Sequence, residues 1–186
     1  GSTQKELPEE PEDYIDNIHI AAKDGNIESI KYILALHPLV INAALEKSLK
    51  TALHIAVENR QIEAIKVLCE NGADTNAINS ELESPLHMAV SIEDVEMINI
   101  LLENGAMIDI PDNEGNSPLF FAIKKLNKEI MELLISKGAK VAMRNKYQLT
   151  PIHFAAEFNN VEIVSLLLDH GADVNTVTVA GVTPLS

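Results

Sequence analysis

Two kinds of short stretch with helical spacing of apolar residues alternate along most of the chain. In the first kind the apolar residues lie three positions apart, as Leu53 and Ala56 do, so that they share one face of a helix. In the second kind, as at 62–69 and 161–168, apolar residues recur at helical spacing and charged residues occupy the other side. The pattern predicts pairs of short helices.

These pairs recur with a fixed period. A Gly-Ala step follows each second stretch, and its glycines, 33 residues apart, are Gly72, Gly105, Gly138 and Gly171. Each first stretch follows a hydroxyl residue, at Thr51, Ser84, Ser117, Thr150 and Thr183. A hydroxyl caps free backbone N–H groups at a helix start, and glycine suits the left-handed residue that ends a helix. A fixed period of this kind predicts a stacked repeat array.

The repeat units resemble ankyrin repeats. The resemblance is carried by the 33-residue period, by Ser84-Pro-Leu-His87 and Thr150-Pro-Ile-His153, and by Asn71-Gly-Ala-Asp74, and it covers residues 18–186. It implies an all-α solenoid of helix-turn-helix units whose linkers project as β-hairpin fingers. It also implies a protein-protein interaction module that binds its partner in the concave groove formed by the fingers and the first helices.

The expected boundaries follow the period. Residues 1–17 are expected to be an acidic tail that begins with a Gly1-Ser2 cloning remnant, and residues 18–50 an atypical capping repeat whose Ala21 aligns with Ala56. Four full repeats are expected at 51–83, 84–116, 117–149 and 150–182, and residues 183–186 open a further repeat that is cut short.

Composition narrows the function classes. The net charge is −14, which argues against a nucleic-acid binder. One cysteine rules out an internal disulfide framework and fits a reducing intracellular compartment such as the cytoplasm. No apolar run approaches the roughly 18 residues that span a bilayer, so no membrane insertion by this chain is expected. A monomer is expected.

No catalytic, cofactor or metal site is expected. His54, His87 and His153 recur at repeat spacing, but packed helices would hold them about 10 Å apart, too far for one zinc ion. Each histidine is instead expected to tie its helix start to the finger loops, with Phe120 in that position once. Cys69 stands where other repeats carry Leu or Ile, so a buried thiol is expected rather than a nucleophile. We therefore expect no enzymatic activity.

The charge distribution suggests where a partner binds. Residues 84–116 carry −7, whereas residues 117–149 carry +5. Resemblance to the family places the following residues on the fingers or at the groove-side ends of first helices: Lys124, Lys125, Arg144, Lys146, Tyr147, Phe158, Glu58, Glu81, Glu83 and Glu114. The groove is thus expected to be acidic towards the N-terminus and basic towards the C-terminus, and to bind a protein segment whose acidic stretch contacts the basic residues.

Alternatives stay open at this point. The same charges could be ordinary solvated ones, each worth about 0–1 kcal/mol, and Lys128, which replaces an apolar residue, favours local drift. Leu82, on a fingertip, is either strained packing or an apolar partner contact. The fragment could also be the accessory domain that recruits a target for a larger multidomain enzyme, secreted effector or channel.

Two further features depend on the family pattern. Asn76 and Asn175 resemble the ankyrin-repeat asparagines that an animal asparaginyl hydroxylase modifies, although hydrogen bonding within the finger would explain them as well. The turn between paired helices, usually glycine in this family, holds Arg60, Glu93 and Leu126 instead. Left-handed backbone is therefore expected at residues that do not favour it.

Overall fold

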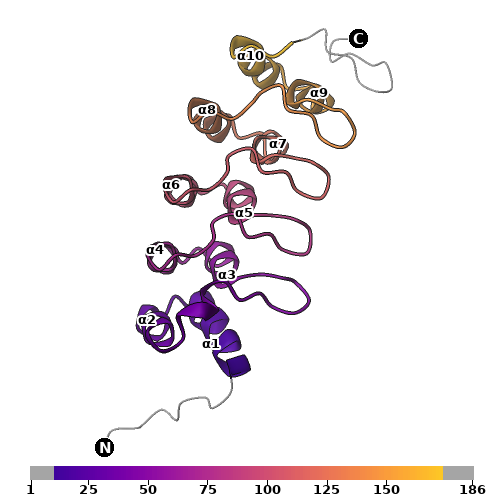
Figure 1. Cartoon of the computed structure of the whole chain (residues 1–186). Helices are drawn as coiled ribbons and strands as arrows, with labels where there is room; N and C mark the ends of the chain where they lie inside the picture. The colour runs from indigo at the N-terminus through magenta and orange to yellow at the C-terminus, as the bar shows by residue number, and fades with distance from the viewer. Residues whose placement is uncertain (1–10, 174–186) are drawn as a thin grey trace, which may run out of the picture.

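The computed structural model describes residues 11–173, in which ten α-helices form five stacked pairs and one 3-10 helix lies outside the pairs (Figure 1). The first helices are α1 (Pro11–Asp24), α3 (Ala52–Glu58), α5 (Pro85–Ile92), α7 (Pro118–Lys124) and α9 (Pro151–Glu157). The second helices are α2 (Ile27–Leu36), α4 (Ile62–Glu70), α6 (Val95–Glu103), α8 (Lys128–Ser136) and α10 (Val161–Asp169), and η1 (Pro38–Asn42) follows α2. The two kinds of helix form two columns, and the loops between repeats project to one side. The expected all-α solenoid is confirmed.

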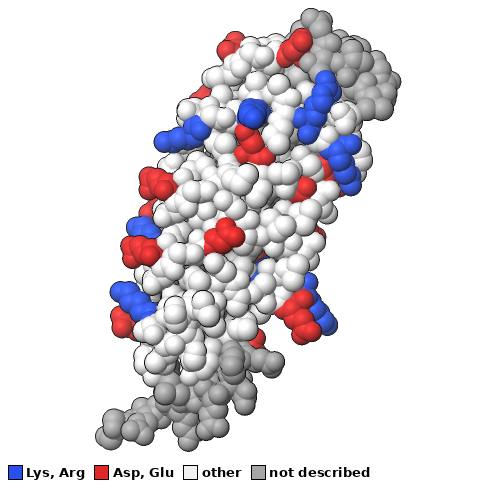
Figure 2. All heavy atoms as spheres, in the orientation of Figure 1, with Lys and Arg blue, Asp and Glu red and all other residues white. Residues whose placement is uncertain are grey.

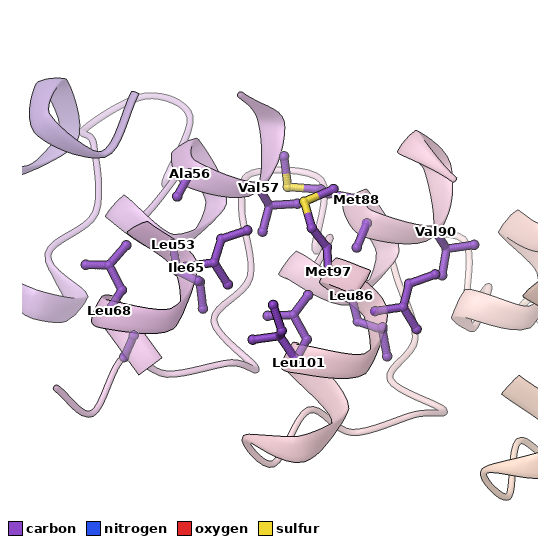
Figure 3. Close-up of a cluster of buried hydrophobic side chains, with 14 of the residues drawn as sticks. Leu53, Ala56, Val57, Ile65, Leu68, Leu86, Met88, Val90, Met97 and Leu101 are labelled. Atoms are coloured by element: carbon purple, nitrogen blue, oxygen red, sulfur yellow. The ribbon is translucent and has the colours of Figure 1, made fainter. Parts of the chain in front are cut away.

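The core lies between the two columns and repeats with the sequence period. The leucine and alanine of the first helix are fully buried, as at Leu53, Ala56, Leu86 and Ala89. Figure 3 shows Leu53, Ala56 and Leu86 in one cluster with Ile65, Leu68, Met97 and Leu101 of the second helices. The small alanine lets the neighbouring first helix approach closely, and successive first helices contact one another from α1 to α9. One continuous apolar core therefore spans the array.

His54 and His87 tie their first helices to the following finger, as expected, whereas the finger expected to follow His153 lies outside the described residues. The N–H of Thr51 donates to His54 Nδ1 at 3.1 Å, which leaves Nε2 to donate to the carbonyl of Glu83 at 3.0 Å. His87 repeats the arrangement with Ser84 N–H and the carbonyl of Asn116. Burial lowers the pKa of both His54 and His87, so that each ring stays neutral and keeps this tautomer near neutral pH.

One first helix lacks this tie. Phe120 of α7 stands where the others carry histidine, and it is almost fully buried. The hydroxyl of Ser117, at the start of α7, is buried without a hydrogen-bond partner. A buried hydroxyl without a partner destabilises the folded state by about 1–3 kcal/mol. Repeat 117–149 is thus less well capped than its neighbours.

The fingers (residues 43–51, 76–84, 109–117 and 142–150) differ from the expected β-hairpins, because residues 11–173 contain no strand. The last three of these turns close around a side chain instead: the Oδ1 atom of Asn79 accepts from the N–H groups of Glu81 and Glu83, and Asp112 and Asn145 do the same in the next two fingers. One backbone hydrogen bond joins successive fingers, as from Lys146 N–H to the carbonyl of Glu114 at 2.9 Å. The Asn or Asp side chain thus accepts hydrogen bonds from backbone N–H groups that would otherwise pair with a neighbouring strand.

The first repeat begins earlier than expected. Helix α1 starts at Pro11, seven residues before the boundary drawn at residue 18, because Tyr14, Ile18, Ala21 and Ala22 form one buried stripe at helical spacing. His19 also takes the position of His54, with Nε2 2.9 Å from the carbonyl of Lys50. The match of His19-Ile-Ala21 to His54-Ile-Ala56 could have revealed both features.

The turns between helices have the left-handed backbone expected of them. Arg60, Glu93 and Leu126 have φ of +55°, +64° and +53°, and the fingertip residues Leu82 and Gln148 have +58° and +65°. Such a conformation costs a residue with a Cβ about 1–2 kcal/mol. Leu49, which the repeat pattern did not single out, forms the preceding fingertip, also has φ of +58°, and is as exposed as Leu82.

Candidate partner-binding groove

A hollow of about 600 Å³ lies on the finger side of the first helices α7 and α9. All four phenylalanines of the chain line it: Phe120, Phe121, Phe154 and Phe158. The rings of Phe120 and Phe154 are 5.4 Å apart, and that of Phe158 stands edge-on to Phe154 at 5.3 Å. Phe120 is buried, whereas Phe158 is 38% exposed. The rings therefore form one aromatic surface that leads from the core into the hollow.

Two lysines line the same hollow. Lys124 is the last residue of α7, and Lys125 follows it as the C-cap. Both side chains are exposed, and neither forms an ion pair with any residue in 11–173. In Figure 2, basic side chains gather in the upper part of the visible face, at the height of α7 to α9 in Figure 1. The lysines are thus available to an acidic ligand.

Acidic residues of two fingers form the opposite wall. Glu81, Glu83, Asp112 and Glu114 line the hollow beside the phenylalanines. Partial burial, a hydrogen bond that protonated Glu83 donates to the carboxylate of Glu81, and the negative charges of Glu81 and Asp112 raise the pKa of Glu83 to about 7. Burial, and after it the neighbouring carboxylates, therefore disfavour the charged form of Glu83, and the charge of Lys50 offsets this only in part.

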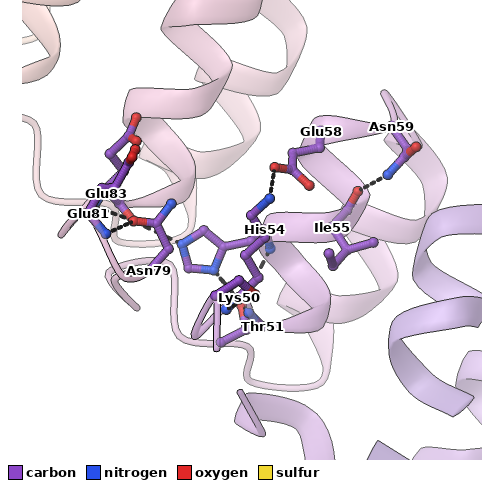
Figure 4. A network of polar contacts seen from close by, with 10 residues as sticks. Lys50, Thr51, His54, Ile55, Glu58, Asn59, Asn79, Glu81 and Glu83 are labelled. Carbon is purple, nitrogen blue, oxygen red and sulfur yellow. Dashed lines mark hydrogen bonds and ion pairs between the residues drawn. The ribbon is translucent and has the colours of Figure 1, made fainter. Parts of the chain in front are cut away.

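A second hollow continues the first towards the N-terminus. It measures about 470 Å³ and shares Glu81, Glu83 and Ser91 with the first, so the two form one groove. Lys50 and Glu58 line this second part and form an ion pair with their Nζ and Oε1 atoms 2.5 Å apart (Figure 4). The structure thus gives Glu58 a partner within the chain, which sets it apart from the other acidic residues of the groove.

The remaining predicted contacts lie on neighbouring finger positions. Arg144, Lys146 and Tyr147 line neither hollow. Arg144 Nη1 donates to the carbonyl of Gln148 at 2.7 Å, and Lys146 Nζ lies 5.1 Å from the centre of the Tyr147 ring. Tyr147 and Leu82 are about half exposed. The structure brings Lys124, Lys125 and Phe158 together with Glu81, Glu83 and Glu114. The finger at 142–150, which carries Arg144, Lys146 and Tyr147, remains a separate patch.

Asn76 has a structural role. Its Nδ2 donates to the carbonyl of Gly105 at 3.0 Å, and its Oδ1 accepts from the N–H of Met107 at 2.7 Å. The side chain thereby ties one repeat to the next. Hydroxylation of Asn76 stays a prediction, and Asn175 lies outside the described residues.

The cysteine, the metal-ligating side chains and the helix lengths bear on the remaining expectations. Burial raises the pKa of the Cys69 thiol to about 11, so the nucleophilic thiolate is disfavoured. No group of three or more His, Cys, Asp or Glu side chains within residues 11–173 is placed to hold a metal ion. In the same stretch, no helix combines the length and apolar character that crossing a membrane requires.

Family comparison accounts for the repeated geometry. A model described as ankyrin repeats (3 copies) matches residues 7–79 and 78–145, and a single ankyrin-repeat model matches residues 147–179. The chain belongs to the ankyrin-repeat family. Ankyrin repeats typically serve protein-protein interaction and are typically not catalytic. The matched region begins before residue 18, in agreement with the early start of α1.

Two curated relatives share part of this ankyrin array. The palmitoyltransferase akr1 of Schizosaccharomyces pombe is 37% identical over 65 residues, which is 35% of this chain and 10% of that protein. Alpha-latroinsectotoxin-Lt1a of Latrodectus tredecimguttatus is 37% identical over 60 residues, which is 32% of this chain and 4% of the toxin. The similarity thus covers a tenth or less of each relative.

The charged residues of the groove could be found from the sequence, but most of its aromatic surface was missed. Of the four phenylalanines, only Phe158 was predicted to contact a partner, and Phe120 was expected only in the position of a histidine. The signal was available, because three of them fall on two successive first helices and Phe158 is the C-cap residue of the second. Asp112 was also missed, and its side chain both closes a finger turn and adds to the acidic wall.

Proposed function

We propose that this ankyrin array binds an extended segment of another protein in the groove between its fingers and first helices. The observation that carries the proposal is the gathering of every phenylalanine of the chain in one hollow with two lysines that have no ion-pair partner in residues 11–173. Exposed aromatic surface beside unpaired cations is typical of the energetically dominant part of a protein interface.

Each side of the hollow has a distinct task in this proposal. Phe154 and Phe158 receive an apolar side chain of the bound segment, because their rings lie at the mouth of the aromatic surface. Lys124 and Lys125 receive an acidic residue nearby. Arg144, Lys146 and Tyr147 extend the contact to the next finger, where Tyr147 offers a half-exposed ring.

A display library of random linear peptides tests the proposal, because selection from it requires no identified partner. The parent chain should enrich peptides that contain an apolar residue near an acidic one. Phe158→Ser and Lys124→Glu/Lys125→Glu should each retain these peptides at least about ten-fold more weakly, the usual effect of removing a central interface contact.

The matched control is Lys128→Glu/Lys137→Glu. It makes the same charge change on and just after α8, which lies in the column away from the fingers (Figure 1). All variants should first show the helical circular dichroism of the parent. Enrichment that is equal on the parent and on both groove variants, or no enrichment at all, would contradict the proposal.

A second candidate is favoured by the relatives, in which the matched repeats are a small part of a longer chain. In that role the same groove recruits a target for an activity located elsewhere in a larger protein. Fusing the array to an unrelated reporter enzyme would test it: the reporter should act faster on a substrate tagged with an enriched peptide, and an unchanged rate would count against recruitment.

A further inference from the structure

We infer that the segment bound in this groove carries a basic side chain next to its apolar anchor, and that the carboxylates of Glu81 and Glu83 receive it. The inference rests on the proposed function and adds the chemistry of the partner to it. It concerns the acidic wall, which consists of Glu81, Glu83, Asp112 and Glu114. The contact proposed above is a different one, in which an acidic residue of the partner binds the two lysines at the end of α7.

Glu81 and Glu83 occupy the junction of the groove. They line both hollows, so they stand where the two parts of the groove meet. Their side chains come from the same finger and lie close together in Figure 4. A segment that follows the groove past the phenylalanines must therefore cross these two carboxylates.

The carboxylates of the acidic wall also form no ion pair within residues 11–173. The ion pairs within residues 11–173 join Lys50 to Glu58, Arg60 to Asp94, and Lys66 to Glu63 and Glu96. None of them involves Glu81, Glu83, Asp112 or Glu114. Lys50 lowers the pKa of Glu83, yet it is already paired with Glu58, and the pKa of Glu83 stays raised in spite of it. A cation supplied by the partner would relieve the repulsion.

The surroundings of the carboxylates favour a basic side chain over a metal ion. No three acidic or histidine side chains of the described residues are placed to surround a metal ion. The carboxylates instead face a hollow that also contains the rings of Phe121 and Phe154. An arginine or lysine side chain lays its apolar stem, and arginine also its flat cation, on aromatic rings while its charged end reaches a carboxylate. A basic residue of a peptide fits both surfaces.

Three display libraries test the inference. They are identical random peptides except for one fixed pair, Leu-Arg, Leu-Ser or Leu-Glu. The parent chain should enrich the Leu-Arg library most. Binding of a peptide enriched from it should weaken by about ten-fold or more when Glu81→Gln/Glu83→Gln replaces the parent, as expected for the loss of a charge-assisted hydrogen bond.

The matched control removes two charges elsewhere. Glu129→Gln/Glu132→Gln changes two exposed residues of α8 and should bind like the parent. Asp112 is left intact, because its carboxylate holds the finger turn. Peptide binding by the parent should also weaken as the pH falls from 8 to 6, since Glu83 takes up a proton near pH 7; Glu83→Gln should lose most of this dependence.

The outcomes separate the two proposals. Enrichment of the Leu-Glu or Leu-Ser library over Leu-Arg, or equal binding by Glu81→Gln/Glu83→Gln, would overturn the basic-residue inference and leave the groove as the binding site. Enrichment of none of the three libraries would overturn the proposed function, and this inference with it.

Discussion

The repeats at 84–116 and 117–149 stack directly on each other, yet they start their first helices differently. In the first, His87 accepts from Ser84 and donates to the carbonyl of Asn116. In the second, Phe120 takes the same position and the hydroxyl of Ser117 is left without a partner. The cores of the two repeats are alike, because Leu86 and Leu119 are both fully buried.

The difference faces the groove rather than the core. Phe120 gives up the polar tie and extends the aromatic surface formed with Phe154 and Phe158. The charge changes at the same place, from −7 in residues 84–116 to +5 in residues 117–149. A repeat array can vary one helix start in this way because the apolar positions that stack the repeats stay unchanged.

The largest effect should come from the shared core. Replacing Leu86 or Leu119 by alanine removes a fully buried side chain, so each change should lower the free energy of unfolding by about 2–5 kcal/mol. Urea unfolding followed by circular dichroism measures both. Losses that agree within about 1 kcal/mol would fit equivalent cores, whereas a loss below about 1 kcal/mol at either site would mean that its surroundings collapse around the cavity.

A smaller loss should follow from breaking the histidine tie. His87→Phe gives repeat 84–116 the helix start of its neighbour, so the N–H of Ser84 loses its acceptor and the carbonyl of Asn116 loses a donor. We expect the free energy of unfolding to fall by about 1–3 kcal/mol. The new ring keeps contact with Phe121, which already lies 4.8 Å from that of His87. No measurable loss in the same urea titration would show that the polar tie contributes nothing net.

The contrast between these repeats also shows how far the sequence could predict the structure. The period and the apolar spacing predicted the helix pairs and their stacking, because burial of Leu53, Ala56 and their equivalents depends on local pattern alone. The fingers were less predictable, since their shape depends on which N–H groups Asn79 and Asp112 capture. Only part of the groove was predictable. The charge excess of a repeat can be counted from the sequence, whereas the ion pair of Lys50 with Glu58 forms only because two segments meet in the folded chain.

The reverse exchange should appear in the pH dependence. Phe120→His places a further histidine at a buried position, where burial should lower its pKa as it does for His54 and His87. Unfolding restores a pKa near 6.5, so the unfolded chain gains protons as the pH falls below this value while the folded chain does not. As the pH falls, the free energy of unfolding of Phe120→His should therefore decrease relative to that of the parent. The total decrease should be about 1.4 kcal/mol for each unit by which the folded state lowers the pKa of the new histidine.

Taking the difference between the two proteins removes the contribution of Glu83, which acts in the opposite sense. Its raised pKa adds stability that is complete below about pH 4.5 and is lost as the pH rises through about 7. Urea titrations of both proteins at a series of pH values from 8 to 5 provide the test. A difference that does not change with pH would mean that the new ring is charged or exposed.

The smallest effect should come from the fingertips, where the same two repeats differ again. The tip before repeat 84–116 is Leu82 with φ of +58°, whereas the next tip is Gly115 with +76°. Leu82→Gly relieves left-handed strain of about 1–2 kcal/mol but adds about 0.5–1 kcal/mol of unfolded-chain entropy, so a net gain of about 0.5 kcal/mol is expected. Gly115→Ala should instead destabilise, because a Cβ atom there would lie 2.7 Å from the backbone N of Lys146. Thermal unfolding of both variants measures these two changes in stability.

A gain in stability by Leu82→Gly that is accompanied by weaker binding of an enriched peptide would identify this exposed leucine as a partner contact. A gain in stability with unchanged binding would make it strained packing alone.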